Sequence, residues 1–403
     1  LCNHLTRILL PAQAFFYAGG VVSAVLLSRR LFLLPALGPL IYNFGIILGG
    51  LFFSRYLGIA ALAYGAVAGT FVGVFLINAI GAARAGAGYR ISFDIGNPAF
   101  REWVRLSIPL MLGVSLVTAD DWILRFFASG VEGDIARLNY AKRLVGVPIA
   151  VLGQAAGEAS LPFFARLFGE RKLQELSDTV NAAVTRLVAL SLLASSFMVS
   201  AALPLIDLVY RRGYFLFSDS QQTATYFFWF SLSLAFWSAQ SLYARAYYAA
   251  GKTLAPMIAS TLVTLASLPV YAVLFRTFSS AGLAIASDIG IAANCMAVAL
   301  LLHHRKLVDI GQLRWTELGK VLVTAAAAAL LSYEVGQVVK ISGGRLADIN
   351  SLLLTGITWA GAVASGLWLT RSKLLNELRR RPATPATRDT EPASEVLSPR
   401  LEP

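Results

Sequence analysis

Two long apolar segments joined by a short polar loop carry side chains that lipid does not tolerate. They lie near residues 106–128 and 144–165. An ionised side chain at the middle of a membrane helix costs about 2.5–3.5 kcal/mol, so such groups usually face a protein interior or a wet cavity. We therefore interpret the polar residues of these segments as candidates for a substrate or ion path: Asp120, Asp121, Arg125, Lys142, Arg143, Gln154 and Glu158.

Three of these residues share one face of the second segment. At 100° per residue, Arg143, Gln154 and Glu158 fall within an arc of about 60°. A polar stripe on an otherwise apolar helix predicts that the helix lines a substrate or ion path. The alternative is structural: Asp121 and Arg125 stand one helical turn apart and could neutralise each other, and Arg143 could reach the lipid headgroups from a helix end.

The composition sets the class of protein. Of the 403 residues, 57% are hydrophobic and only 14% are charged. Soluble globular proteins carry about 25% charged residues, so these values indicate a polytopic membrane protein. The net charge of +12 comes from Lys and Arg in short loops between apolar runs. Basic residues in such loops set membrane orientation, so the charge does not indicate nucleic-acid binding.

Nothing in the sequence indicates catalysis or a metal cluster. Cys2 and Cys295 lie far apart, in or beside apolar segments. The three histidines, His4, His303 and His304, lie at the edges of apolar runs. Neither a nucleophile with its base nor a group of metal ligands is visible. We therefore expect a protein that is not an enzyme.

Apolar runs of about 18 to 25 residues predict an all-α protein with about eleven transmembrane helices. The connecting loops alternate between rich and poor in basic residues, which places the C-terminus in the cytoplasm by the positive-inside rule. The expected spans lie near residues 7–27, 35–54, 57–81, 106–128, 144–165, 183–209, 223–250, 255–275, 281–302, 318–339 and 351–370.

Glycines at intervals of four residues mark the second and third expected spans. They are Gly45 and Gly49 in one span, and Gly65, Gly69 and Gly73 in the next. Small residues along one helix face let two backbones approach closely. The spacing therefore predicts tight helix packing and not a phosphate-binding loop.

Several runs of this sequence resemble one known family. They are RLFLLPALGPLIYNFGIIL, LNYAKRLVGVPIAVLGQAAGEASLPFFARL, LVYRRGYFLFSDSQQTATYFFWFSLSL and ARAYYAAGKTLAPM. In this order they resemble the MurJ (MviN) lipid II flippases of bacterial peptidoglycan synthesis. The resemblance extends from the start of the chain to about residue 302.

The resemblance implies a two-lobe, MATE-like architecture, with six helices in each lobe and a further pair. The eleven expected spans are then family helices four to fourteen, and a chain that begins at Leu1 lacks the first three. The implied divisions are 1–81 for the remnant of the N-terminal lobe, 82–104 for a cytoplasmic connector, 105–303 for the C-terminal lobe, 304–370 for the extra helix pair, and 371–403 for a basic, then disordered cytoplasmic tail.

The resemblance also implies a function and a binding site. Such proteins move lipid II from the inner to the outer leaflet of the bacterial cytoplasmic membrane by alternating access. Their essential arginine falls on Arg143. Lys142 stands where relatives often have an acidic residue, and it would strengthen the cationic site for the diphosphate headgroup. We group Gln154 and Glu158 with these two as expected substrate-binding residues.

Some members of the family bind sodium, and the resemblance places this site on Asp121 and Ser287. Ser267 and Tyr271 stand at the other implied positions, and they are poorer ligands than the carboxylate and amide usual there. Sodium coupling is therefore not favoured, and no other cofactor is expected. The full set of expected ion-coupling residues is Asp120, Asp121, Ser287 and Asp288.

Other functions remain open at this stage. The chain could export another undecaprenyl-linked glycan or a drug, or act as a non-transporting membrane scaffold for cell-wall enzymes. The expected partners are lipid II or a related polyprenyl-diphosphate glycan, membrane lipids and cell-wall synthesis proteins, with no nucleic acid. Transport assays with lipid II separate the first two functions, and helices encoded ahead of Leu1 would favour a transporter over a scaffold.

Overall fold

The structure of the chain is a computed structural model. It describes residues 2–29, 31–88, 96–98, 100–104, 119–251, 254–338 and 345–372. Within these ranges every regular element is a helix, which confirms the expected fold class. The chain divides into two compact units, residues 1–101 and 102–403, which are described separately.

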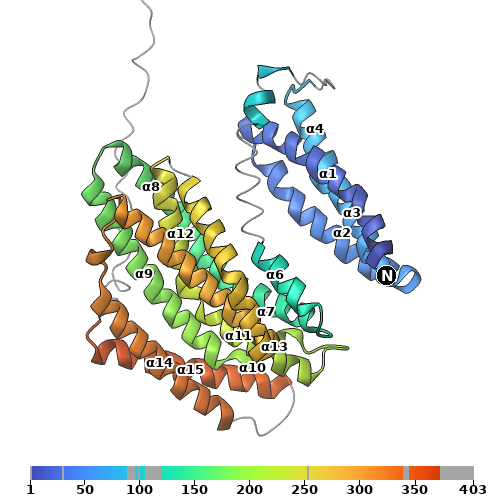
Figure 1. Ribbon diagram of the computed structural model, residues 1–403. Coiled ribbons are helices and arrows are strands. Elements are labelled where there is room, and N and C mark those ends of the chain that lie inside the picture. The colour runs from blue at the N-terminus through green and yellow to red at the C-terminus, as the bar shows by residue number, and fades with distance from the viewer. Residues whose placement is uncertain are drawn as a thin grey trace, which may run out of the picture. The chain divides into compact units, whose positions relative to one another are not determined.

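The first unit is a bundle of three long helices, drawn in blue in Figure 1. Gly58 ends the second helix with a φ of 55°, in the left-handed region that glycine adopts without cost. The third helix is continuous but passes through a π-helical stretch. The elements are α1 (Cys2–Ser28), α2 (Leu33–Leu57), α3 (Ala60–Gly69), η1 (Thr70–Leu76) and α4 (Ile77–Arg84).

A seam of glycines joins α2 to the third helix, as their spacing predicts. A Cβ atom added to Gly49 would lie 2.6 Å from the carbonyl oxygen of Ala61 and 2.8 Å from the Cα of Gly65. A Cβ on Gly69 would lie 2.8 Å from the carbonyl oxygen of Tyr42. The two backbones therefore touch directly, and no larger residue fits between them.

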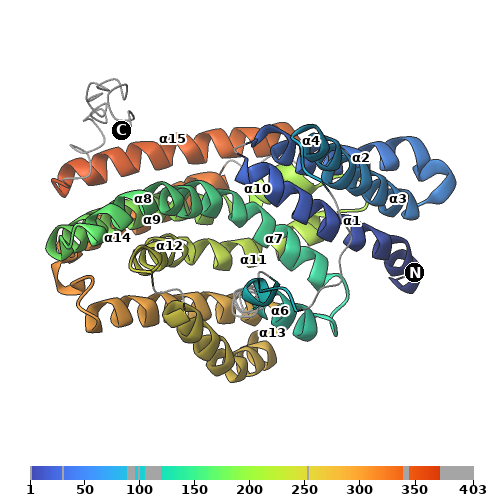
Figure 2. The same ribbon diagram turned by 90° about the horizontal axis from the view of Figure 1, so that it is seen from above.

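The second unit is built around a long central helix. This helix, α9, packs against α8, α11, α12 and α14. Helices α14 and α15 lie along its outer side, as Figures 1 and 2 show. The elements of the unit are α6 (Ala119–Ala128), α7 (Asp134–Pro148), η2 (Ile149–Gln154), α8 (Ala155–Gly169), α9 (Leu173–Ser200), α10 (Ala202–Tyr210), α11 (Phe217–Leu232), α12 (Leu234–Ala249), α13 (Leu254–His304), η3 (Ile310–Gln312), α14 (Trp315–Val338) and α15 (Arg345–Leu369).

The 51-residue α13 consists of two arms that fold back on each other. Ser279 interrupts the helix with a φ of 52°, and the chain reverses there. The side chain of Ser260 in the first arm donates a hydrogen bond to Asn294 Oδ1 in the second, at 2.9 Å. This reversal brings residues that are equally far from Ser279 to the same level of the bundle.

Eight helical stretches of the described ranges are long and apolar enough to cross a membrane. The expected spans of the second unit differ from its helices in several boundaries. The span expected at 223–250 is divided between α11 and α12, which are separated at Ser233. The span expected at 183–209 begins earlier, because α9 runs from Leu173 to Ser200 and a separate helix, α10, follows. Most of the expected span 106–128 and almost all of the tail 371–403 lie outside the described residues.

The glycine seam makes a testable prediction. Gly49→Ala should lower the free energy of unfolding by about 1–3 kcal/mol, because the added methyl group has to push two helix backbones apart. Thermal unfolding of the purified protein in detergent measures this change. Gly20→Ala is the matched control, since a Cβ there has open space around it. Equal unfolding midpoints for both variants would contradict the seam.

Candidate functional site

Charged and hydroxyl side chains cluster where α6, α7 and the two arms of α13 meet. Asp120 and Asp121 lie in the first turn of α6. Lys142 lies in the middle of α7. Tyr271 comes from the first arm of α13, and Ser287 comes from the second. We call these five residues the polar cluster.

Lys142 is the centre of the polar cluster. Its Nζ lies 2.7 Å from Asp120 Oδ2 and 2.5 Å from Asp121 Oδ1. The ammonium group also lies 5.9 Å from the centre of the Phe230 ring, in cation–π range. One cation therefore binds both carboxylates of α6 and ties that helix to α7.

Asp120 uses both of its carboxylate oxygens. Tyr271 is almost fully buried, and its hydroxyl donates a hydrogen bond to Oδ1. Lys142 and the hydroxyl of Ser287, the latter at 3.2 Å, donate to Oδ2. The carboxylate that contacts Ser287 is thus that of Asp120, and Asp121 contacts Lys142.

Asp288 adjoins the polar cluster. Its electrostatic neighbours include Asp120, Lys142 and Ser233. Its Oδ1 atom is buried and has no hydrogen-bond partner among the residues that the structure describes. The four residues expected from the sequence to couple an ion are therefore neighbours in space, and Lys142, which was expected to bind substrate, lies among them.

The polar cluster does not fit a sodium ion. Hard metal cations bind through several oxygen lone pairs. Here the oxygens of Asp120 already accept hydrogen bonds from three side chains, and an ammonium group stands between the two carboxylates. Ser267, the other implied ligand, donates its hydroxyl to the carbonyl oxygen of Thr264.

The expected substrate-binding residues other than Lys142 lie on an exposed face of α7, η2 and α8. Arg143, Gln154 and Glu158 are all exposed. Val147 and Val151, which lie between them in sequence, are 60% and 64% exposed. The π-helical turn η2 follows Pro148 at the end of α7 and changes the helical repeat between Arg143 and Gln154.

Arg143 and Glu158 differ in their partners. Glu158 Oε1 lies 3.8 Å from Nη2 of Arg245 on α12, at the edge of ion-pair distance. Arg143 has no ion pair with any residue in the described part of the chain. Among the described residues, the exposed face therefore presents a cation without an ion-pair partner, followed by the exposed apolar side chains of Val147 and Val151.

A second polar network was not predicted from the sequence. Arg137 on α7 donates hydrogen bonds to Asp134 at 2.9 Å and to Asp219 at 2.7 and 2.9 Å. Ser280, at the start of the second arm of α13, donates to the other oxygen of Asp134. The three-residue spacing of Asp134 and Arg137 is a local signal for their pairing. Asp219 is 82 positions from Arg137, so only the fold reveals that contact.

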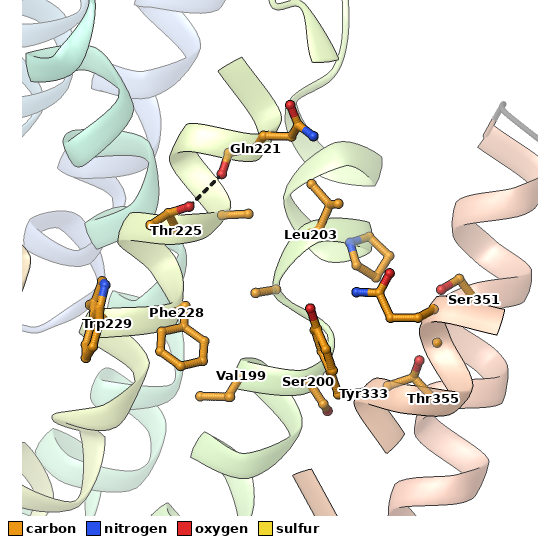
Figure 3. A pocket seen from close by; sticks show the side chains of 15 residues that line it. Val199, Ser200, Leu203, Gln221, Thr225, Phe228, Trp229, Tyr333, Ser351 and Thr355 are labelled. Atoms are coloured by element: carbon orange, nitrogen blue, oxygen red, sulfur yellow. Dashed lines mark hydrogen bonds between the residues drawn. The ribbon is translucent and has the colours of Figure 1, made fainter. Parts of the chain in front are cut away.

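A cavity of about 390 Å³ lies between α9, α10 and α11 on one side and α14 and α15 on the other. Figure 3 shows Phe228 and Trp229 on one wall and Tyr333, Ser351 and Thr355 on the opposite one. None of the residues expected to bind substrate or an ion lines it. The cavity is therefore distinct from both the polar cluster and the Arg143 face.

Comparisons with known proteins agree with the resemblance of the sequence runs. The family model described as "Lipid II flippase MurJ" matches residues 1–346. A probable lipid II flippase MurJ of Synechocystis is 24% identical over 349 residues, which are 83% of this chain and 64% of the relative. The corresponding protein of Bdellovibrio bacteriovorus is 25% identical, over 84% of this chain and 64% of its own length.

A solved structure has the same fold. The chain is similar to the structure titled "Lipid II flippase MurJ, inward closed conformation", with a TM-score of 0.71 and 20% identity. That match covers 93% of this chain and 75% of the other. The chain thus spans somewhat less than two thirds of the length of the curated relatives it matches.

The second network makes a pH-dependent prediction. The backbone N–H of Leu216 and the guanidinium of Arg137 hold the pKa of Asp219 below its ordinary value. Asp219 therefore stabilises the fold above its unfolded pKa of about 3.9, and this contribution is lost as the pH falls through the lower folded value. Asp219→Asn should cost about 1–2 kcal/mol at neutral pH. The deficit should shrink below about pH 4.

Thermal unfolding of wild type and variant across a pH series measures this deficit. Asp178→Asn is the matched control, because that exposed carboxylate accepts a hydrogen bond from Gln174 at 3.2 Å and has no guanidinium among its described partners. It should have little effect at any pH. A deficit for Asp219→Asn that stays constant down to the lowest pH would refute the assignment.

Proposed function

The chain belongs to the lipid II flippase MurJ family, and on that premise we propose that it moves lipid II across the bacterial cytoplasmic membrane. The multi-pass helical fold supports this proposal, since a lipid-linked glycan requires a path through the bilayer. An exporter of a different undecaprenyl-linked glycan, or a scaffold, finds no specific support in the site. We further propose that the C-terminus lies in the cytoplasm, as the basic loops indicate.

The observation that carries the proposal is Arg143, which is exposed and has no ion pair within the described part of the chain. A cation on an apolar helix face is costly in lipid, so its position favours an anionic partner or a wet cavity. Arginine donates hydrogen bonds in a planar fork that matches phosphate oxygens. The diphosphate of a polyprenyl-linked precursor is an anion of this kind, and it has to pass the middle of the membrane.

The rest of the exposed face suits the other parts of such a cargo. Gln154 and Glu158 lie further along the same face and offer hydrogen-bonding groups for sugar hydroxyls and amides. Val147 and Val151 leave the face between them apolar. We propose that the headgroup binds along this face and that its polyprenyl tail stays in lipid.

Transport would follow from alternating access. In that scheme the residues up to 81 and the lobe from 105 to 303 change their relative position, with residues 82–104 as a cytoplasmic connector and 304–370 as an added helix pair. The lobe from 105 to 303 is suited to move as one body, because α6, α7 and α13 are joined by the polar cluster. We also propose that cell-wall synthesis proteins receive the cargo on the far side.

Replacement of Arg143 tests the proposed function. In the full-length protein, Arg143→Ala should reduce lipid II translocation about tenfold or more. A loss of this size is expected because the substitution removes a charge-assisted hydrogen bond. Arg143→Lys should retain part of the activity, since a lysine keeps the charge without the fork. Complementation of a flippase-depleted bacterium, with membrane levels measured in parallel, gives the readout.

Arg212→Ala serves as the matched control, because Arg212 is an exposed arginine in the loop before α11 and lies off the exposed face. It should complement normally. Full complementation by Arg143→Ala at normal membrane levels would overturn the proposed function.

A further inference from the structure

We infer that Lys142 is a tethered cation that permanently occupies the carboxylates of Asp120 and Asp121, so that this chain binds no sodium ion at the polar cluster. The inference deepens the proposed function, on which its account of Arg143 rests, because it concerns the charge that balances the carboxylates near the proposed substrate face. It agrees with the sequence, in which Ser267 and Tyr271 already disfavour sodium coupling.

The first support is the position of the ammonium group. Nζ of Lys142 lies 2.7 Å from one carboxylate and 2.5 Å from the other, which is direct contact with both. A metal ion that bridged Asp120 and Asp121 would have to occupy the same space. The two cations would repel each other at close range, so one excludes the other.

The second support is the direction of the hydrogen bonds around Asp120. The hydroxyls of Tyr271 and Ser287 donate hydrogen bonds to this carboxylate. A hydroxyl that coordinates a metal ion turns its oxygen lone pairs towards the ion. The hydrogen bonds observed here satisfy an acidic residue that already has its counter-ion.

The third support is the covalent attachment of Lys142 to α7. Its side chain is 27% exposed, and its ammonium group lies 5.9 Å from the centre of the Phe230 ring. A cation on a side chain has a fixed local concentration and does not leave for solvent, whereas a bound sodium ion depends on the sodium concentration outside. The occupancy of the cluster is therefore set by the fold.

The arrangement also separates the two neighbouring cations of α7. Lys142 turns towards the acidic residues of α6, and Arg143 lies on the exposed face. Within the proposed function, Lys142 reduces the negative field that these carboxylates would otherwise exert on an anionic headgroup bound at Arg143. Lys142 is thus a positioning and charge-balancing residue, and Arg143 is the residue that contacts substrate.

Thermal unfolding in solutions of different cations tests the inference. The wild-type protein should have the same midpoint in sodium chloride and in choline chloride at equal ionic strength. Lys142→Ala should have a midpoint lower by about 2–4 °C or more, because two carboxylates lose their counter-ion. Sodium or propylammonium ions should then raise the midpoint of Lys142→Ala above its value in choline.

Two controls make the result specific. The double variant Lys142→Ala with Asp120→Asn should lose the response to sodium and propylammonium, because half of the carboxylate pair is gone. Lys320→Ala removes another paired ammonium group, 3.0 Å from Glu317 on α14, and should show no response to either cation.

Two outcomes would overturn the inference. The first is a rise of the wild-type midpoint in sodium, relative to choline, that is as large as the rise measured for Lys142→Ala. The second is a Lys142→Ala midpoint that is the same in sodium, propylammonium and choline. If Lys142→Ala does not fold, calorimetric titration of the wild-type protein with sodium tests the inference instead. Measurable sodium binding would overturn the inference, and the absence of binding would support it. These measurements require no transport, so loss of the proposed function would leave them unaffected.

Discussion

The second unit depends on one constraint, which is that an ionised group inside a membrane helix needs a partner. Asp120 and Asp121 stand in the first turn of α6, and each meets the ammonium group of Lys142 on α7. Tyr271 and Ser287 add hydrogen bonds from both arms of α13. Loss of Lys142 would leave two carboxylates without their counter-ion, so these contacts favour one register of four helical segments. A helix bundle with apolar contacts alone has no comparable determinant of register, because lipid and side chains are equally apolar.

Local departures from the regular α-helix place these groups. The non-helical φ of Ser279 folds α13 into two arms, and this brings Tyr271 and Ser287 to the same carboxylate. Pro148 and the π-helical turn after it adjust the face that begins at Arg143. The ends and bends of the helices therefore determine which polar side chains lie on each helix face. The apolar stretches between them have less influence.

Two attachments bind the last helix pair to the rest of the second unit. Buried residues of α14 and α15 form one apolar cluster with α9, and the indole N–H of Trp359 donates a hydrogen bond to Ser196 on that helix at 2.8 Å. Beyond this contact the helices separate around the cavity of about 390 Å³. The pair is thus integral to the unit. The described residues that line the cavity are aliphatic, aromatic, hydroxyl and amide residues, with no charged group among them.

The sequence alone determined the membrane class, the helical fold and the family, because apolar run length and loop charge are local properties of the chain. It also predicted the glycine seam between α2 and the third helix, and it singled out the residues of the polar cluster. Only the tertiary structure decided how those charges pair. Lys142 and Arg143 are adjacent in sequence and alike in charge, and the sequence placed both in one cationic site. Neighbouring positions on a helix point about 100° apart, so α7 turns Lys142 towards α6 and leaves Arg143 on the exposed face. Which helix stands on each side of α7 is a long-range property that no local pattern contains.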